Sequence, residues 1–232
     1  MKIVKFESGR VTWLFPLEEF VPAAGASNPS VISQIAARYG FSIVPMITTQ
    51  ESMAKNGLLF GMGQFEVNGT RFAITEFVVY NDGIVAVAEK TDWAEAFLED
   101  VTSWVREQFG FRNVSSGVRR LYASTIVVDF ETPLSRIVSG YEIISKLITS
   151  RTVTIMPEPT QPMQFSRIDF EIDRTTMTGQ LALPKFVLER RAAMSFSQER
   201  YFSIAPMHTT DHVVVLEQIE KLAGSVPVAA QR

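Results

Sequence analysis

The sequence contains no cysteine, and this absence excludes several kinds of chemistry at once. Without a thiol, the chain has no disulfide framework, no cysteine-ligated zinc or iron–sulfur site and no thiol nucleophile. No apolar run approaches the ~20 residues that a membrane-spanning helix needs. The N-terminal segment has no apolar run before Glu7, so no secretion signal is predicted. We therefore expect a cytoplasmic protein without a membrane partner.

Charge is also limited, and neither sign dominates. The chain has 22 Lys and Arg against 25 Asp and Glu, which leaves a net charge of −3 over 232 residues. With this balance of charges, the protein has no overall electrostatic field that would attract phosphate groups. This argues against sequence-independent nucleic-acid binding. The 46% of hydrophobic residues and 20% of charged residues instead indicate an ordinary globular protein with a sizeable core.

Hydrophobic periodicity predicts a chain of mixed helices and strands. Helices are expected at about 28–40, 92–110, 132–148 and 211–223, and strands at about 3–15, 41–46, 58–67, 71–80, 84–89, 121–130, 167–172, 178–188 and 196–205. Asp92 and Glu95 have the spacing of a capping box, and Gly224 is expected to end the last helix. The proline-rich segment 156–162 is expected to be a linker or an edge. These elements predict an α+β protein with an antiparallel sheet backed by helices.

The two halves of the chain repeat one order of elements. Residues 1–118 and 119–224 are each expected to contain a strand, a helix, an antiparallel meander and a closing helix, followed by a flexible tail at 225–232. Thr91-Asp92 and Thr210-Asp211 start the two closing helices directly after a strand. This order is similar to one repeat of the TATA-binding-protein-like fold, which implies a curved sheet with helices on one face. A single irregular domain without duplication is the alternative.

His208 and His212 are the only histidines, and their spacing of four is the start of a metal site on a helix face. A third histidine or cysteine is missing, and so is the Glu of an H-E-x-x-H motif, so we predict no metal and no cofactor. No G-x-S-x-G elbow accompanies any serine. Gly61 and Gly63 lie within a predicted strand, so no helix N-terminus follows them to bind a phosphate. These features favour a protein without catalytic activity.

Two groups of arginines lie among aromatic residues. Guanidinium and aromatic side chains can stack on bases or hold an anionic ligand. Neither group lies in a basic domain, so ordinary salt bridges are the favoured explanation. The candidate ligand or nucleic-acid contacts are Arg119, Arg120, Arg190, Arg191, Arg200, His208 and His212.

A dense apolar stretch near the N-terminus is interrupted by prolines. Trp13, Phe15, Leu17 and Phe20 lie within eight positions, and Pro16 prevents a continuous helix or central strand. No regular element is predicted to bury these side chains. We therefore predict that the stretch forms an interface, because rigid aromatic segments dock with little loss of conformational freedom.

Together these observations predict a non-catalytic interaction or assembly module, a subunit of a homo- or hetero-oligomeric complex with protein partners. One alternative is a ligand-binding or hydrolytic enzyme domain that uses the concave face of the sheet. A second alternative is nucleic-acid binding through the arginine and aromatic patches.

Overall fold

The computed structural model describes residues 1–20, 28–46, 57–67, 69–114, 117–138, 140–152, 163–176 and 183–225. The strands are β1 (Lys2–Leu14), β2 (Leu58–Val67), β3 (Thr70–Tyr80), β4 (Gly83–Ala88), β5 (Arg119–Asp129), β6 (Arg167–Phe170), β7 (Phe186–Arg190) and β8 (Arg200–Ala205). The helices are α1 (Asn28–Tyr39), α3 (Thr91–Phe109), α4 (Tyr141–Thr152) and α5 (Thr209–Ser225). The prediction of an α+β protein with an antiparallel sheet is confirmed.

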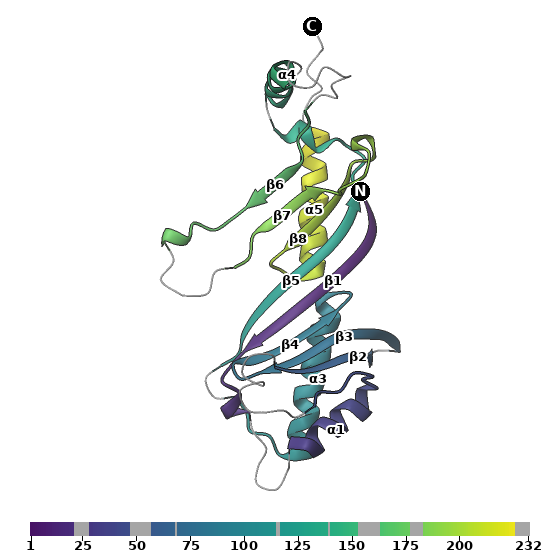
Figure 1. Cartoon of the computed structure of the whole chain (residues 1–232), viewed down its shortest axis with the longest axis vertical. Coiled ribbons are helices and arrows are strands. Elements are labelled where there is room, and N and C mark those ends of the chain that lie inside the picture. The colour runs from purple at the N-terminus through teal and green to yellow at the C-terminus, as the bar shows by residue number, and fades with distance from the viewer. Residues whose placement is uncertain are drawn as a thin grey trace.

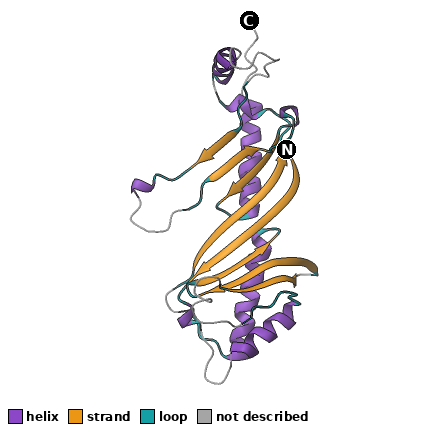
Figure 2. Cartoon of the chain, in the orientation of Figure 1, coloured by secondary structure: helices purple, strands orange, loops and turns teal. Residues whose placement is uncertain are grey.

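The described strands form one eight-stranded sheet in the order β2-β3-β4-β1-β5-β8-β7-β6, with every neighbouring pair antiparallel (Figure 1). The central pair, β1 and β5, joins the two ends of the molecule. Outward from β1 the neighbours are β4, β3 and β2, and outward from β5 they are β8, β7 and β6. Figure 2 shows the long helices α3 and α5 behind the strands of the twisted sheet.

Two hydrophobic clusters form the core, one at each end of the sheet. The first lies between α1, α3 and the strands β1 to β4, and it is rich in aromatic rings; the Tyr39 and Phe97 rings, for example, meet at 4.9 Å. The second lies between α5 and the strands β5 to β8, around Ile126, Leu188 and Tyr201. Burial of these apolar side chains is the main force that holds the helices on the sheet.

The structure corrects several of the expected element boundaries. Lys90, not Asp92, is the N-cap of α3, and its side chain makes no capping hydrogen bond. The predicted strand at 41–46 is only a single bridge between Ile43 and Gly61. Gly224 lies inside α5, which continues to Ser225. The ends of these elements depend on tertiary contacts, which local sequence patterns do not specify.

The largest correction concerns the helix expected at 132–148. Residues Leu134–Ile137 form only a 3₁₀ turn, and the helix α4 begins later, at Tyr141. Within the described residues, the strands expected at 178–188 and 196–205 are found as β7, which begins at Phe186, and β8, which begins at Arg200; residues 178–182 lie outside the described residues. The expected linker at 156–162 lies outside the described residues, as does most of the tail at 225–232.

Gly9 lies where β1 passes the start of α3. A Cβ atom at this position would lie 2.0 Å from the backbone nitrogen of Thr91. No side chain fits there, because the colliding atoms belong to backbone and cannot rotate away. The close approach of β1 to α3 therefore requires glycine at position 9.

We expect Gly9→Ala to lower the free energy of unfolding by more than about 3 kcal/mol, since overpacking against backbone has no cheap relaxation. Gly61→Ala is the matched control, because the nearest atoms to its added Cβ belong to the side chain of Ile43, which is half exposed and can shift. The control should change stability by less than about 1 kcal/mol. Urea unfolding of both variants measures the difference, and equal stabilities would contradict the backbone clash.

Candidate interaction site

The structure separates the two histidines, so they share no site. His212 lies in the first turn of α5 and is fully buried beneath the sheet. Its Nε2 lies 2.8 Å from Ser203 Oγ and its Nδ1 lies 3.1 Å from Ser124 Oγ. Ser203 donates its only proton to the Val187 carbonyl at 3.0 Å, so it accepts a hydrogen bond from Nε2. Burial lowers the pKa of His212 to about 4, so the imidazole is neutral at pH 7.

This buried hydrogen-bond network continues to the start of α3. Ser124 Oγ lies 3.2 Å from Thr209 Oγ1, and Thr209 and Thr91 exchange two hydrogen bonds from backbone N–H to side-chain oxygen. All of these groups are satisfied within the protein, and none faces solvent. The arrangement explains His212 as a structural residue that ties α5 to the sheet.

His208 lies at the surface in a different cluster. Its ring lies against that of Tyr122 in a tilted arrangement, with the centroids 3.9 Å apart, and its Nε2 lies 3.6 Å from Glu95 Oε2. Glu95 Oε1 accepts hydrogen bonds from Arg120 and from the Tyr122 hydroxyl, both at 2.8 Å. Burial raises the pKa of Tyr122 to about 12, and its hydrogen bond to Glu95 contributes to the shift. The Glu95 carboxylate is thus already shared by three partners.

Arg119 and Arg120 lie at the start of β5, whereas Arg190, Arg191 and Arg200 lie together where β7 meets β8, with the Arg191 amide donating to the Arg200 carbonyl at 2.9 Å. Four of the five candidate arginines form ion pairs: Arg120 with Glu95, Arg190 with Glu199, Arg191 with Glu7 and Arg200 with Asp129. The Arg200 pair is two-pronged, at 2.6 and 2.8 Å, and it holds the pKa of Asp129 below its usual range. Arg119 makes no ion pair with any residue that the structure describes. The arginines are not gathered into one basic surface.

The apolar stretch from Trp13 to Phe20 is mostly in the interior. Trp13, Phe15 and Phe20 belong to the first core cluster, and Leu17 packs against it. The Phe20 ring meets Phe15 at 5.8 Å and Phe111 at 4.9 Å. The expectation that no regular element buries this stretch is therefore corrected, since a cluster that includes α1 and α3 covers it. An interface role for these residues stays a prediction.

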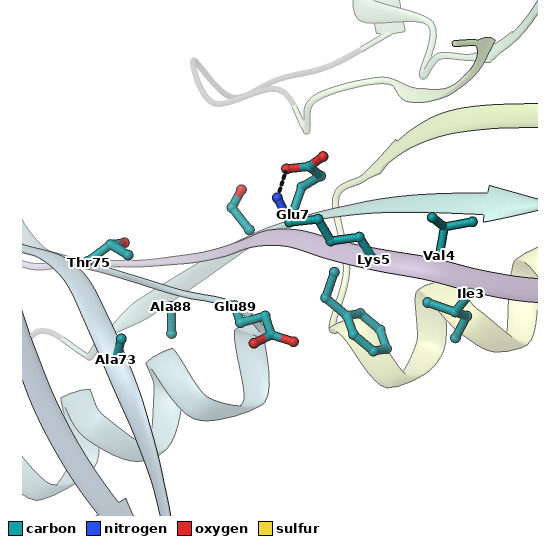
Figure 3. A pocket seen from close by; sticks show the side chains of 10 residues that line it. Ile3, Val4, Lys5, Glu7, Ala73, Thr75, Ala88 and Glu89 are labelled. Atoms are coloured by element: carbon teal, nitrogen blue, oxygen red, sulfur yellow. Dashed lines mark hydrogen bonds and ion pairs between the residues drawn. The ribbon is translucent and has the colours of Figure 1, made fainter. Parts of the chain in front are cut away.

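A cleft of about 580 Å³ lies where β1 runs beyond the end of β4 (Figure 3). Its polar groups include Lys5 and Glu7, which pair with each other at 2.8 Å, and the carboxylate of Glu89. Two bulges interrupt β1 along this edge, and such bulges discourage the addition of a further strand. Within the described ranges, no group of three or more potential metal ligands is found. The cleft offers no evident catalytic set.

The most unusual surface belongs to α4, which presents its apolar side to solvent. Its hydroxyl-bearing side contacts the segment before β6: the Ser145 hydroxyl donates to the Met163 carbonyl, the Met163 amide donates to Thr149 Oγ1 at 2.8 Å, and the Phe165 amide donates to the Tyr141 hydroxyl at 3.1 Å. The opposite side is a contiguous aliphatic patch, here called the α4 surface. It consists of Ile143, Ile144, Leu147 and Ile148, which are 74%, 57%, 56% and 41% exposed.

The apolar periodicity of the helix expected at 132–148 predicts that Ile144 and Ile148 lie on its inner face, whereas the structure places both outside. The periodicity correctly indicated an apolar stripe, but it did not indicate what covers the stripe. The sequence carries one signal of this orientation. Residues 141, 145 and 149 all bear hydroxyl groups and are spaced by four, so they form a second continuous side of the helix that can also pack against the protein.

No protein-family model matches this sequence, and a search of curated proteins finds no significant relative. Among the described helices, none has the length and apolar content needed to cross a membrane. Function is therefore inferred from the surfaces of the molecule itself.

The buried His212 predicts a pH dependence of stability. The unfolded chain binds a proton on this residue with a pKa near 6.5, whereas the folded chain resists protonation until about pH 4. Stability is thus fully present above pH 6.5 and is lost as the pH falls towards 4. The expected loss from this residue between pH 7.5 and pH 5 is about 2 kcal/mol.

Urea unfolding of wild type and His212→Gln at both pH values measures this contribution. The variant should be less stable at pH 7.5 but should lack the extra loss at pH 5. His208→Gln, at the partly buried histidine outside this network, is the matched control and should keep the wild-type slope. The same slope in all three proteins would show that His212 is not the buried neutral group.

The burial of Phe15 and Phe20 makes a second prediction. Replacement of both with Ser should lower the free energy of unfolding by several kcal/mol, roughly 3 to 5 for each large aromatic lost from a core. The interface prediction instead requires an unchanged melting temperature and a loss of assembly. A melting curve combined with light scattering on the double variant distinguishes the two outcomes.

Proposed function

We propose that this chain is a non-catalytic assembly module that associates with a second copy through the α4 surface. The observation that carries the proposal is the inverted orientation of α4, whose hydroxyl side is packed and whose aliphatic side is exposed. A helix in water ordinarily buries its apolar side. The inversion therefore calls for a partner that covers the α4 surface.

The size and character of the patch support a protein partner. Four neighbouring aliphatic side chains at spacings of one, three and four form a continuous stripe on one helix side. Isolated exposed apolar residues are common, but contiguous patches of this kind mark interaction surfaces. Full burial of a Leu or Ile side chain is worth about 1.5 to 3 kcal/mol, so covering the exposed part of the stripe favours association.

The alternative functions receive less support from the described residues. The proposed nucleic-acid contacts are largely neutralised by their own carboxylate partners, as in Arg200 with Asp129. His212 is sealed inside the protein and is not available to a substrate. These observations leave ligand binding and nucleic-acid binding as the less favoured functions.

The finer description of the fold is also a proposal: residues 1–118 and 119–224 are two repeats with a topology similar to the TATA-binding-protein-like fold. The mirrored strand order about β1 and β5 supports it, as does the pairing of Thr91 with Thr209 at the starts of α3 and α5. A duplicated module of this kind has two equivalent edge strands, β2 and β6. Superposition of the two halves with matched connectivity tests this description.

We expect wild type to be dimeric in light scattering and sedimentation experiments. The double variant Ile143→Lys with Leu147→Lys should weaken the dimer by more than about 100-fold in Kd, since each copy then brings two lysines into an apolar contact. Its melting temperature at low protein concentration should be unchanged, because both side chains are exposed in the single chain.

The control is Val214→Lys, which replaces an exposed aliphatic residue on α5 that is outside the α4 surface. This variant should dimerise like wild type. A wild-type chain that stays monomeric at all concentrations would contradict self-assembly through α4.

A further inference from the structure

The sheet ends in two edge strands, and each of them follows a helix in the chain. The edge strand β2 is preceded by α1, and the edge strand β6 is preceded by α4. At the β2 end, α1 buries an aliphatic and aromatic side in the core, and its Tyr39 ring lies 6.3 Å from Phe65 of β2. At this end of the sheet, a helix of the same chain therefore covers the edge strand.

The β6 end of the sheet is left open. Phe170 of β6 is on the same side of the sheet as Phe186, its cross-strand neighbour, with ring centroids 5.8 Å apart. Phe186 in turn faces the buried His212 of α5 at 5.9 Å, so both rings are on the helix side. Phe170 is nevertheless 62% exposed, and Ile172, two residues on, is 46% exposed. These two residues are called here the β6 surface.

The helix α4 is not in a position to cover its own β6 surface. Figure 1 shows α4 at one end of the molecule, beyond the strands, whereas α1 lies beside α3. Its hydroxyl side is held by hydrogen bonds to Met163 and Phe165, which lead directly into β6. Turning the aliphatic side onto β6 of the same chain would break these three bonds. A second copy can approach the aliphatic side while all three remain intact.

We propose that two copies of this chain dock reciprocally, so that the α4 surface of each copy covers the β6 surface of the other. This arrangement, in which each α4 stays bonded to its own chain, is called here the exchange. The contact reproduces between chains what α1 does on β2 within one chain. It is also self-complementary: each copy contributes one α4 surface and one β6 surface, so a two-fold dimer closes with both patches buried. This inference rests on the proposed function, which requires only that the α4 surface binds a second copy.

The absence of cysteine makes the proposal directly testable by engineered disulfides. Two differently tagged copies are co-expressed, one carrying Leu147→Cys and the other Phe170→Cys, and the complex is oxidised and examined on a non-reducing gel. We expect a covalent dimer that contains both tags. The experiment is repeated with Ile144→Cys in place of Leu147→Cys, so that the result does not depend on the orientation of a single side chain.

The matched control pairs Leu147→Cys with Val214→Cys, which is exposed to a similar degree but lies on α5. No mixed covalent dimer is expected from this pair. All four single variants replace exposed residues, so each should keep the wild-type melting temperature.

The other outcomes separate the exchange from the assembly on which it rests. Disulfides between two Leu147→Cys chains would overturn the exchange in favour of α4 pairing with α4, and self-assembly through α4 would stand. A dimer that forms no mixed disulfide with a cysteine at either α4 position would likewise overturn the exchange alone. An intrachain disulfide in the double variant Leu147→Cys with Phe170→Cys, in a chain that is monomeric by light scattering, would overturn both proposals.

Discussion

The pairing of β1 with β5, which joins the two ends of this molecule, is reinforced by a reciprocal contact between the starts of two helices. The first N–H groups of a helix have no partner within it. In α3 and α5, the amide of Thr91 donates to Thr209 Oγ1 at 2.9 Å and the amide of Thr209 donates to Thr91 Oγ1. Each helix thus satisfies the other, and since both residues are buried, water cannot replace either bond.

This contact has an electrostatic cost that neighbouring residues reduce. The positive ends of two helix dipoles meet, which is unfavourable on its own. Asp92, in the first turn of α3, places a carboxylate beside both helix starts and accepts a hydrogen bond from the Thr210 hydroxyl at 2.7 Å. The same junction requires a glycine in β1, where backbone passes closest to α3. Its hydrogen bonds continue through Ser124 and His212 to β8, so the junction links the sheet to both long helices.

The two ends of the sheet differ in how their first helix is used. In α1, the residues Val31, Ile32, Ile35, Ala36 and Tyr39 are all buried in the core. In α4, the residues Ile143, Ile144, Leu147 and Ile148 have the same spacing and are all exposed. The difference does not come from the apolar pattern, which is equivalent in the two helices. It comes from the hydroxyl side of α4, which makes specific hydrogen bonds to the chain before β6 and so turns the aliphatic side outward.

Local sequence patterns predict several elements close to where the structure has them. The periodicities placed β2, β3, α1 and α3 close to their observed ranges, and Gly110 ends α3 in the left-handed conformation that glycine favours. Tertiary structure alone decided which face meets which neighbour. The stretch at Trp13 joined the core, one histidine was buried and the other remained at the surface, and the stripe of α4 stayed exposed. The physical reason is that periodicity specifies an apolar face, whereas the group that covers this face is set by contacts between residues distant in the chain.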